Sequence, residues 1–360
     1  AEFPTGEAKR LGELTREKWR EHLALFSQVK NTVLEVNPNV NLPFNLEKGK
    51  SSSLGLFAEA AFREKPGKFP KGKHALEVWP AHKRSAILGR IIFNDTEGRI
   101  YRDIDIKGIG AVVRPETTAE VSAYVGFRRY GGEREGLLDC DSAFFDRQAS
   151  EEFLQAGIRT YRVLAIIELK EIIANQQKLS LSEAIREGII DKDFRPVVEV
   201  RAFGVKTRIE DLSFMKSSPE EKRLLLEDAK KVVSQELGYK KPFSIKEYFV
   251  WFAKTLGRNI GLMHKNGWRH EYLGCRFHNI TLDCRIVDLD SVTRLKSEVY
   301  GKEDVEDALT SFMGGLIGSF SSEVDYSGRQ ALEQQFLESY DSVFPPEERK
   351  RYFNRVSKEK

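Results

Sequence analysis

The apolar pattern changes along this chain, and that change limits most strongly the folds that it can adopt. The first half carries short apolar segments bounded by turn residues, which is typical of β-strands. In the second half, apolar residues recur every three to four positions, the period of an amphipathic helix. We therefore expect an α+β fold with an antiparallel five-stranded sheet, one helix inserted after the third strand, and a helical second half. The strands are predicted at 76–79, 86–94, 99–106, 161–169 and 197–203, and the helices at 142–156, 180–187, 219–236, 245–266, 302–319 and 328–344.

The N-terminal part is expected to lie outside this sheet. Apolar residues between 8 and 36 recur at helical spacing, so a helix is predicted there. Residues 37–74 mix Asn, Pro, Gly, Ser and Lys and are expected to form loops, with a short helix at 54–62. The predicted domains are an N-terminal helix and loop extension (1–74), a strand-rich N-lobe (75–212) and a helical C-lobe (213–360).

Composition excludes several classes of protein. Lys and Arg total 58 against 55 Asp and Glu, a formal net charge of +3, and no dense basic block is present, so nucleic acid is not expected as a partner. The three cysteines form no CxxC pair, which argues against a disulfide scaffold or structural zinc and fits a reducing, cytoplasmic location. No apolar run is as long as a membrane span, so none is expected.

Residues 278–290 contain the most specific chemical signal. Two short apolar runs flank a polar tip at Asp283–Arg285, which predicts a tight β-hairpin. Asn279 stands at its entrance, and Asp288 and Asp290 at its exit have the spacing that places both on one face of a strand. Amide and carboxylate oxygens suit Mg²⁺ bound together with substrate phosphates. The alternative is a surface hairpin whose carboxylates are solvated.

Strands, a helix, strands and then helices with a metal-type hairpin follow the order of the two-lobed protein-kinase fold. That fold holds its metal ions with an Asn of the catalytic loop and the Asp of the following strand. Asn279 and Asp288 are therefore the predicted metal ligands. The catalytic cleft is expected between the two lobes.

Lys107 and Glu151 are the first candidates for chemistry. Lys107 ends the third predicted strand, and Glu151 lies on the helix that follows. In a kinase fold, the lysine of this strand holds nucleotide phosphates and a helix glutamate fixes it. The alternative for Lys107 is a side chain that reaches the surface.

Further cations lie at strand ends. Arg201 interrupts an apolar strand and Arg208 follows it, so the two guanidinium groups are expected to grip phosphate oxygens, unless they lie at a solvated strand edge. Arg84, in the turn after the first strand, is a further candidate for phosphate contact, with a solvated turn as the alternative. His270 is interpreted as a packing and hydrogen-bonding residue.

Together these residues resemble the selenoprotein O (SelO) family of kinase-fold AMP-transferases. The similarity covers about 86–290 as short motifs in order and at similar spacing. The motifs are Leu88-Gly89, Asp105-Ile106-Lys107-Gly108-Ile109-Gly110, Ser150-Glu151, Gly157-Ile158-Arg159-Thr160-Tyr161-Arg162, Arg201 with Arg208, Gly267-Trp268-Arg269-His270, and Asn279 with Asp288.

The resemblance implies a function. ATP would bind in a reversed orientation, with its γ-phosphate against Lys107, Arg201 and Arg208. A Ser, Thr or Tyr hydroxyl of a protein substrate would attack the α-phosphorus and pyrophosphate would leave. Mg²⁺ or Mn²⁺ bound through Asn279 and Asp288 would neutralise phosphate charge.

One departure from the family keeps other functions open. The family has Asp immediately before the metal-binding Asn, whereas this chain has His278. An imidazole can accept a hydroxyl proton near neutral pH, so His278 is a candidate base, with Glu271 and Asp290 as alternatives. The replacement is equally compatible with a phosphotransferase that binds ATP in the usual orientation, or with a pseudokinase that binds nucleotide or a partner without turnover.

Overall fold

The described part of the chain forms two compact units. Within that part, unit 1 comprises residues 22–147 and 162–203, and unit 2 comprises residues 148–161 and 204–359. The boundary between the units falls inside one helix, α1 (Cys140–Gln155). The computed structural model describes residues 22–62, 72–78, 84–113, 122–124, 129–130, 133–134, 136–174, 176–214 and 218–359.

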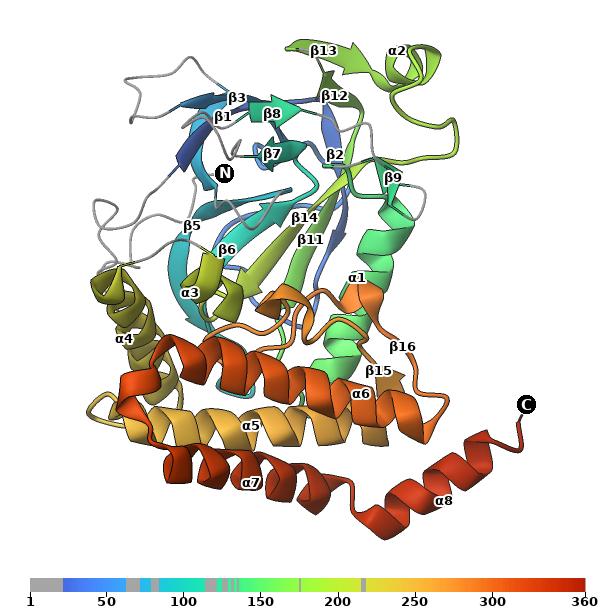
Figure 1. The fold of residues 1–360 in the computed structure, drawn as a ribbon. Coiled ribbons are helices and arrows are strands. Elements are labelled where there is room, and N and C mark those ends of the chain that lie inside the picture. The colour runs from blue at the N-terminus through green and yellow to red at the C-terminus, as the bar shows by residue number, and fades with distance from the viewer. Residues whose placement is uncertain are drawn as a thin grey trace. The chain divides into compact units, whose positions relative to one another are not determined.

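Unit 1 is built on an eight-stranded sheet in which every neighbouring pair of strands is antiparallel (Figure 1). Its strands, in spatial order, are β2 (Asn31–Val36), β11 (Arg162–Leu169), β14 (Val197–Phe203), β6 (Ile100–Lys107), β5 (Ser85–Asn94), β4 (Lys73–Val78), β1 (His22–Gln28) and β3 (Leu56–Phe62). The five predicted strands are all present and occupy consecutive positions in this sheet, from β11 to β4.

The two faces of the central strands differ in chemistry. Side chains alternate between the faces of a strand, and one set of alternate positions on β6 and β14 joins the hydrophobic core of unit 1: Ile104, Ile106, Val198, Val200 and Ala202. The other set carries charged groups that are nonetheless buried: Asp103, Asp105, Lys107, Glu199 and Arg201. Charged residues therefore line a buried sheet face, an arrangement that needs paired partners.

Smaller elements complete unit 1. Three two-stranded ladders pair β7 with β8, β9 with β10, and β12 with β13, and a short helix follows β13. Their bounds are β7 (Ala111–Val113), β8 (Ser122–Tyr124), β9 (Arg129–Tyr130), β10 (Glu133–Arg134), β12 (Glu171–Ala174), β13 (Gln177–Ser180) and α2 (Leu181–Arg186).

Unit 2 is mainly helical. Its helices are α3 (Ile209–Phe214), α4 (Pro219–Glu236), α5 (Ile245–Lys265), α6 (Glu298–Leu309), which continues as a π-helical segment (Thr310–Ile317), α7 (Tyr326–Val343) and α8 (Pro346–Val356). Single 3₁₀ turns lie at Cys275–Phe277, Leu289–Ser291 and Ser321–Glu323, and β15 (Trp268–Arg269) pairs with β16 (Thr293–Arg294).

Helices α5 and α7 lie side by side (Figure 1). Two glycines on α5 allow this close approach, because a Cβ atom at Gly257 would lie 2.2 Å from the Phe336 carbonyl oxygen, and one at Gly261 would lie 2.2 Å from a Val343 methyl group. Helix α5 begins with a capping box in which Ser244 and Glu247 satisfy each other's backbone N–H groups. The long helix predicted at 245–266 is thereby confirmed.

The structure corrects the N-terminal prediction. From residue 22 onward the predicted helix over 8–36 is instead β1 and β2, and residues 8–21 lie outside the described residues. The short helix predicted at 54–62 is β3. The sheet therefore has eight strands rather than five, because the supposed extension supplies β1, β2 and β3, of which β2 and β3 form the two edges.

Candidate functional site

The charged face of the unit 1 sheet holds Lys107 and Arg201. Exposure is 0% for Asp105, 4% for Lys107 and 1% for Arg201, which excludes both the snorkelling lysine and the solvated strand edge. Arg201 and Asp105 are opposite each other in the β14–β6 ladder, and the guanidinium donates two hydrogen bonds to that carboxylate, at 2.9 and 2.6 Å. Arg201 is therefore held in a buried, bidentate ion pair within its own sheet.

Lys107 has an acidic neighbour in the same ladder. Glu199 is its direct cross-strand partner, so the two side chains lie on one face. Asp146, on the unit 1 part of α1, interacts with Glu199 as well. Burial, followed by the charge of Asp146, raises the pKa of Glu199 well above its usual range, while Lys107 and Arg201 act in the opposite direction.

Arg84 has a partner inside unit 1. Its guanidinium donates a hydrogen bond of 2.8 Å to the Leu137 carbonyl, and its own carbonyl accepts one from Gly108 N–H. These contacts fix Arg84 beside Gly108, the residue that follows Lys107. Its predicted contact with phosphate stays a prediction.

The predicted hairpin is present in unit 2. Val287 N–H donates to the Asn279 carbonyl at 3.0 Å and Thr281 N–H donates to the Arg285 carbonyl at 3.0 Å, which closes the two arms over a turn. Asp288 does not continue as a strand: it adopts a left-handed conformation with φ of 59°, and a 3₁₀ turn over Leu289–Ser291 follows. The expected placement of Asp288 and Asp290 on one face of a strand is therefore wrong.

The hairpin tip is buried rather than solvated. Arg285 donates to Asp283 at 2.7 Å, to Glu236 at 3.3 Å and to the Thr160 carbonyl at 2.9 Å. Arg159, from the Gly157–Arg162 motif, pairs with Glu236 and donates to the Asp283 carbonyl at 2.9 and 3.1 Å. Two arginines and two carboxylates therefore anchor the tip, and the alternative of a solvated surface hairpin is excluded.

The hairpin base brings together four of the predicted site residues, Arg208, His278, Asn279 and Asp288. Arg208 donates to the His278 carbonyl at 2.8 Å, and one of its terminal nitrogens lies 3.6 Å from the Asp288 carboxylate. His278 Nε2 lies 4.0 Å from the same carboxylate oxygen. The side chains of His278 and Asp288 are 27% and 26% exposed, so this carboxylate is accessible from solvent.

Asn279 differs from its neighbours. It is 1% exposed, and its amide nitrogen donates to the Tyr272 carbonyl at 2.8 Å. Its amide oxygen is buried and accepts no hydrogen bond from the described residues. A buried acceptor without a donor is costly, and such groups mark sites where an ion or water belongs.

Backbone strain accompanies this arrangement. Arg276 and Phe277, just before the hairpin, have positive φ angles of 51° and 59°, as Asp288 does after it. Left-handed conformations at non-glycine residues cluster at functional sites, where the surrounding structure holds them in place.

The base fits a divalent cation only in part. Asp288 and the Asn279 oxygen are hard oxygen donors of the kind that Mg²⁺ prefers, and two protein ligands suffice where phosphate oxygens complete the shell. Among the described residues, no group of three His, Cys, Asp or Glu side chains is arranged to hold a metal. The residues therefore fit a cation shared with a phosphorylated ligand and not a closed, all-protein metal site.

Glu210 is an acid that the sequence analysis missed. It is mostly buried at the start of α3, two residues after Arg208. Burial, and then the charge of Asp211, raises its pKa to about 7, against the opposing effect of Arg208 and Arg276. The negative charge of Asp288 raises the pKa of Glu210 further. A carboxyl group that titrates near neutral pH is a candidate proton acceptor.

The remaining predicted residues occupy defined places. Glu151 is buried on the unit 2 part of α1, whereas Lys107 belongs to unit 1. Their predicted pairing stays a prediction. His270 is fully buried, its Nε2 lies 2.6 Å from the Val287 carbonyl, and Asp304 accepts from its backbone N–H. These contacts agree with a packing and hydrogen-bonding role.

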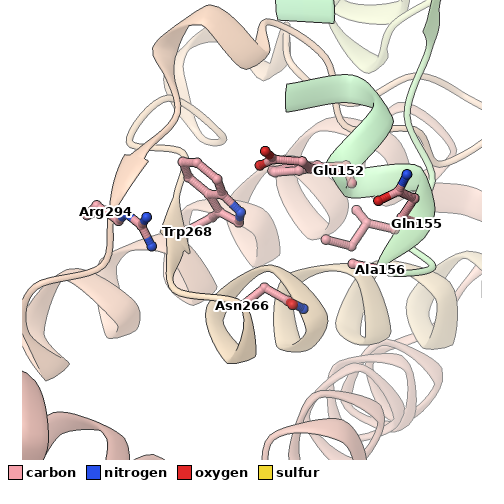
Figure 2. A pocket seen from close by; sticks show the side chains of 8 residues that line it. Glu152, Gln155, Ala156, Asn266, Trp268 and Arg294 are labelled. Carbon is pink, nitrogen blue, oxygen red and sulfur yellow. The ribbon is translucent and has the colours of Figure 1, made fainter. Parts of the chain in front are cut away.

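A pocket of about 430 Å³ lies elsewhere in unit 2 (Figure 2). In Figure 2 the Trp268 side chain lies between those of Glu152 and Arg294. The Arg294 guanidinium stacks at 5.2 Å from the Trp268 ring. The lining residues, which include none of the predicted site residues, are Glu152, Phe153, Gln155, Ala156, Ile158, Asn266, Trp268 and Arg294.

Fold and site together define a mixed helix/sheet protein with a large antiparallel sheet in one unit and a helical second unit that carries a polar hairpin. Within the described residues, every helix is too short or too polar to cross a lipid bilayer.

Comparisons with known proteins add a distant similarity. No protein-family model matches the chain, and no curated protein matches it. Among solved structures, the chain is similar to the kinase domain of a Toxoplasma gondii specific rhoptry antigen, at 10% identity and a TM-score of 0.33, over 76% of this chain and 79% of that chain.

Proposed function

We propose that this chain is a nucleotide-dependent transferase with a kinase-like fold, and that it transfers AMP from ATP to protein hydroxyl groups in the manner of the SelO family that it resembles. Lys107 and Arg201 of unit 1 and Arg208 of unit 2 are the proposed phosphate-binding groups. Glu151 is the proposed partner of Lys107, and Arg84 a further phosphate contact. Asn279 and Asp288 are the proposed ligands for Mg²⁺ or Mn²⁺.

The observation that carries the proposal is the hairpin base. Asn279 presents a buried oxygen to which no described residue donates a hydrogen bond. Val287 is paired with Asn279 across the hairpin, and the accessible Asp288 follows Val287. Arg208 lies beside that carboxylate and supplies a cation for an anionic ligand. Amide oxygen, carboxylate and guanidinium together match the chemistry of a metal-bound phosphate.

The proposed reaction is a displacement at phosphorus. A bond forms between the acceptor hydroxyl oxygen and the α-phosphorus, and the bond from that phosphorus to the α–β bridging oxygen breaks, so that pyrophosphate leaves. The hydroxyl proton passes to His278, whose imidazole is a common type of proton acceptor, or to Glu210, whose pKa is raised to about 7. A bound divalent cation would neutralise charge that develops on the phosphate oxygens.

Labelled ATP tests this function. The full chain is incubated with a mixture of candidate proteins, Mg²⁺ or Mn²⁺, and ATP labelled at either the α- or the γ-phosphate. Transfer of α-label is expected, abolished by Asp288→Ala and strongly reduced by Lys107→Ala. Asp193→Ala, which removes an exposed carboxylate, is the matched control and should retain transfer.

The same experiment separates the alternatives. Transfer of γ-label alone would refute AMP transfer and indicate a phosphotransferase. If neither label is transferred while ATP still stabilises the protein against heat, the pseudokinase alternative holds.

A further inference from the structure

The loop between α4 and α5, residues 237–244, displays two apolar side chains to solvent. Leu237 is 43% exposed and Tyr239 is 58% exposed, and both belong to unit 2. An isolated exposed apolar residue is ordinary in a globular protein, so exposure alone assigns no role. What distinguishes this segment, which we call the α4–α5 loop, is that its backbone is fixed and that its charged residues are all cations.

Hydrogen bonds fix the backbone of the loop. Gly238 has a positive φ of 76°, and its N–H donates to the Gln235 carbonyl at 3.0 Å. The N–H groups of Tyr239 and Phe243 donate to the carbonyl and the hydroxyl oxygen of Ser234, both at 2.9 Å. The Tyr239 ring also packs edge-on against the nearly buried Phe243 ring, with 4.9 Å between the centroids. The loop is therefore ordered by a glycine helix end before any partner binds, which lowers the entropic cost of binding.

Positive charge gathers around the two apolar side chains. The loop carries Lys240 and Lys241, and Lys246 follows in the first turn of α5; all three are exposed. Glu236, just before the loop, is already paired with two arginines. Glu247, just after it, accepts a hydrogen bond in the capping box of α5. The loop itself contains no acid, so the local charge is positive.

We propose that the α4–α5 loop is a docking surface for a membrane that contains anionic phospholipids. Leu237 and Tyr239 enter the interfacial region, where aromatic and aliphatic side chains bind, and the lysines contact the charged head groups. Such binding lies on the membrane surface and needs no spanning helix. This proposal does not rest on the proposed transferase function, because its residues are separate from the hairpin and from the phosphate-binding groups.

The composition of the loop favours a lipid surface over a nucleic acid. Nucleic acids are bound by arginine forks and by stacked aromatic rings, whereas the loop holds no arginine and Tyr239 is its one exposed ring. An aliphatic side chain such as Leu237 gains nothing from a phosphate backbone, but it is buried at a lipid interface. Lysines suit the same interface, because their long stems lie along apolar groups while the ammonium stays among the head groups.

Co-sedimentation of the full chain with vesicles tests the proposal. Vesicles of phosphatidylcholine with about one third phosphatidylserine should bind the protein, at least about tenfold more weakly when the salt is raised from about 0.1 to about 0.5 M. Vesicles of phosphatidylcholine alone should bind it little. The double variant Lys240→Gln with Lys241→Gln should lose at least about tenfold in affinity, because each lysine near an anionic surface contributes about fivefold. Tyr239→Ser should lose about fivefold through its apolar contact.

Matched variants elsewhere in unit 2 separate the loop from the overall charge. Lys350→Gln with Lys358→Gln removes the same charge from exposed positions in and after α8, and Tyr326→Ser removes a ring that is 76% exposed. Both should bind vesicles as the wild type does. Equal losses in the two lysine pairs would overturn the proposal, and so would a wild type that binds both kinds of vesicle equally or neither of them. A single-stranded oligonucleotide bound more tightly than the anionic vesicles, through Lys240 and Lys241, would overturn it too.

Hydrogen exchange of the wild-type chain provides a readout that needs no variant. On anionic vesicles, the backbone amides of residues 237–246 should exchange more slowly, because the lipid covers them, whereas those of α8 should be unchanged. Slower exchange at α8 without slower exchange in the α4–α5 loop would place the contact elsewhere and overturn the proposal.

Discussion

The tip and the base of the hairpin in unit 2 are both rich in charged and polar residues, yet they differ in how those residues are satisfied. At the tip, Asp283 and Arg285 are bonded to each other and to further partners, and both are 1% exposed. At the base, Asn279 keeps a buried oxygen that accepts no hydrogen bond from the part of the chain that the structure describes, and Asp288 faces Arg208 at 3.6 Å while remaining accessible. We call the tip closed, because its charged groups are buried and bonded to one another, and the base open, because it keeps an unsatisfied oxygen and an accessible carboxylate.

This difference separates structural from functional polarity. A closed network of buried charges stabilises the fold only as a whole, because loss of one member leaves its partners uncompensated. An open site keeps unsatisfied groups in the folded state, and a ligand that satisfies them contributes binding energy. Charge alone therefore does not distinguish the two regions, whereas hydrogen-bond partners do.

The largest effect is expected at the tip, from Arg285→Ala. Asp283 and Glu236 would each lose the guanidinium that they contact, so the free energy of unfolding should fall by about 3–5 kcal/mol. Urea denaturation followed by circular dichroism measures this change. Arg258→Ala, at an exposed position of α5, should change stability by less than about 0.5 kcal/mol. A loss at Arg285 as small as that of the control would show that the tip is not closed.

The second-largest effect is expected at the buried Arg201–Asp105 pair of the unit 1 sheet, which is closed in the same sense as the hairpin tip. Arg201→Met should lower the free energy of unfolding by about 3 kcal/mol, because Asp105 would remain buried and ionised without its partner. The double variant Arg201→Met with Asp105→Leu should recover most of that loss, since no unpaired charge is left. Thermal unfolding of the two variants measures the recovery. A double variant no more stable than the single one would mean that the pair contributes through its geometry and not through charge compensation.

The third effect concerns Glu210, beside the open base. Its pKa is raised from 4.5 to about 7, so the folded state binds the proton more tightly than the unfolded state does. Stability contributed by this group is complete below about pH 4.5 and is lost as the pH rises to about 7. After allowance for partial solvent screening, the loss should be about 1–2 kcal/mol. Glu210→Gln should remove it, so the variant should gain stability relative to the wild type over this window. Parallel pH curves for the two proteins would contradict the raised pKa.

The sequence was sufficient to predict those strands and helices whose apolar residues fit only one period, that of a strand or that of a helix. The strands β4, β5, β6, β11 and β14 and the helix α5 all occur where they were predicted. Residues 22–36 were predicted to be helical because their apolar positions satisfy helical spacing, but the same positions also fit two strands joined by a turn. Pairing of β1 with β4 and of β2 with β11 favours the strands. Pairing with distant strands is not visible in local spacing.

The candidate site shows the same limit. The link between Asn279 and Asp288 was predicted from a short hairpin, and its backbone bonds lie within that segment. Glu199 was missed although it interrupts an apolar strand as Arg201 does, so the signal used for the arginine was sufficient to find it. Glu210 carries no such signal, because its raised pKa comes from burial and from charges that only the fold assembles.

The smallest effect on stability, and the sharpest test of the open base, is expected from Asn279→Ala. The substitution removes one hydrogen bond to the Tyr272 carbonyl but also the cost of a buried oxygen without a donor, so the free energy of unfolding should change by no more than about 1 kcal/mol. Asn266→Ala, at an exposed position of the same unit, is the matched control for a lost amide. The two variants should differ in a ligand-dependent way: ATP with Mn²⁺ should raise the melting temperature of the wild type and of the control but not of Asn279→Ala. A loss of several kcal/mol without ligand would instead assign Asn279 to the closed, structural kind of polar group and leave Asp288 as the sole candidate metal ligand of the hairpin base.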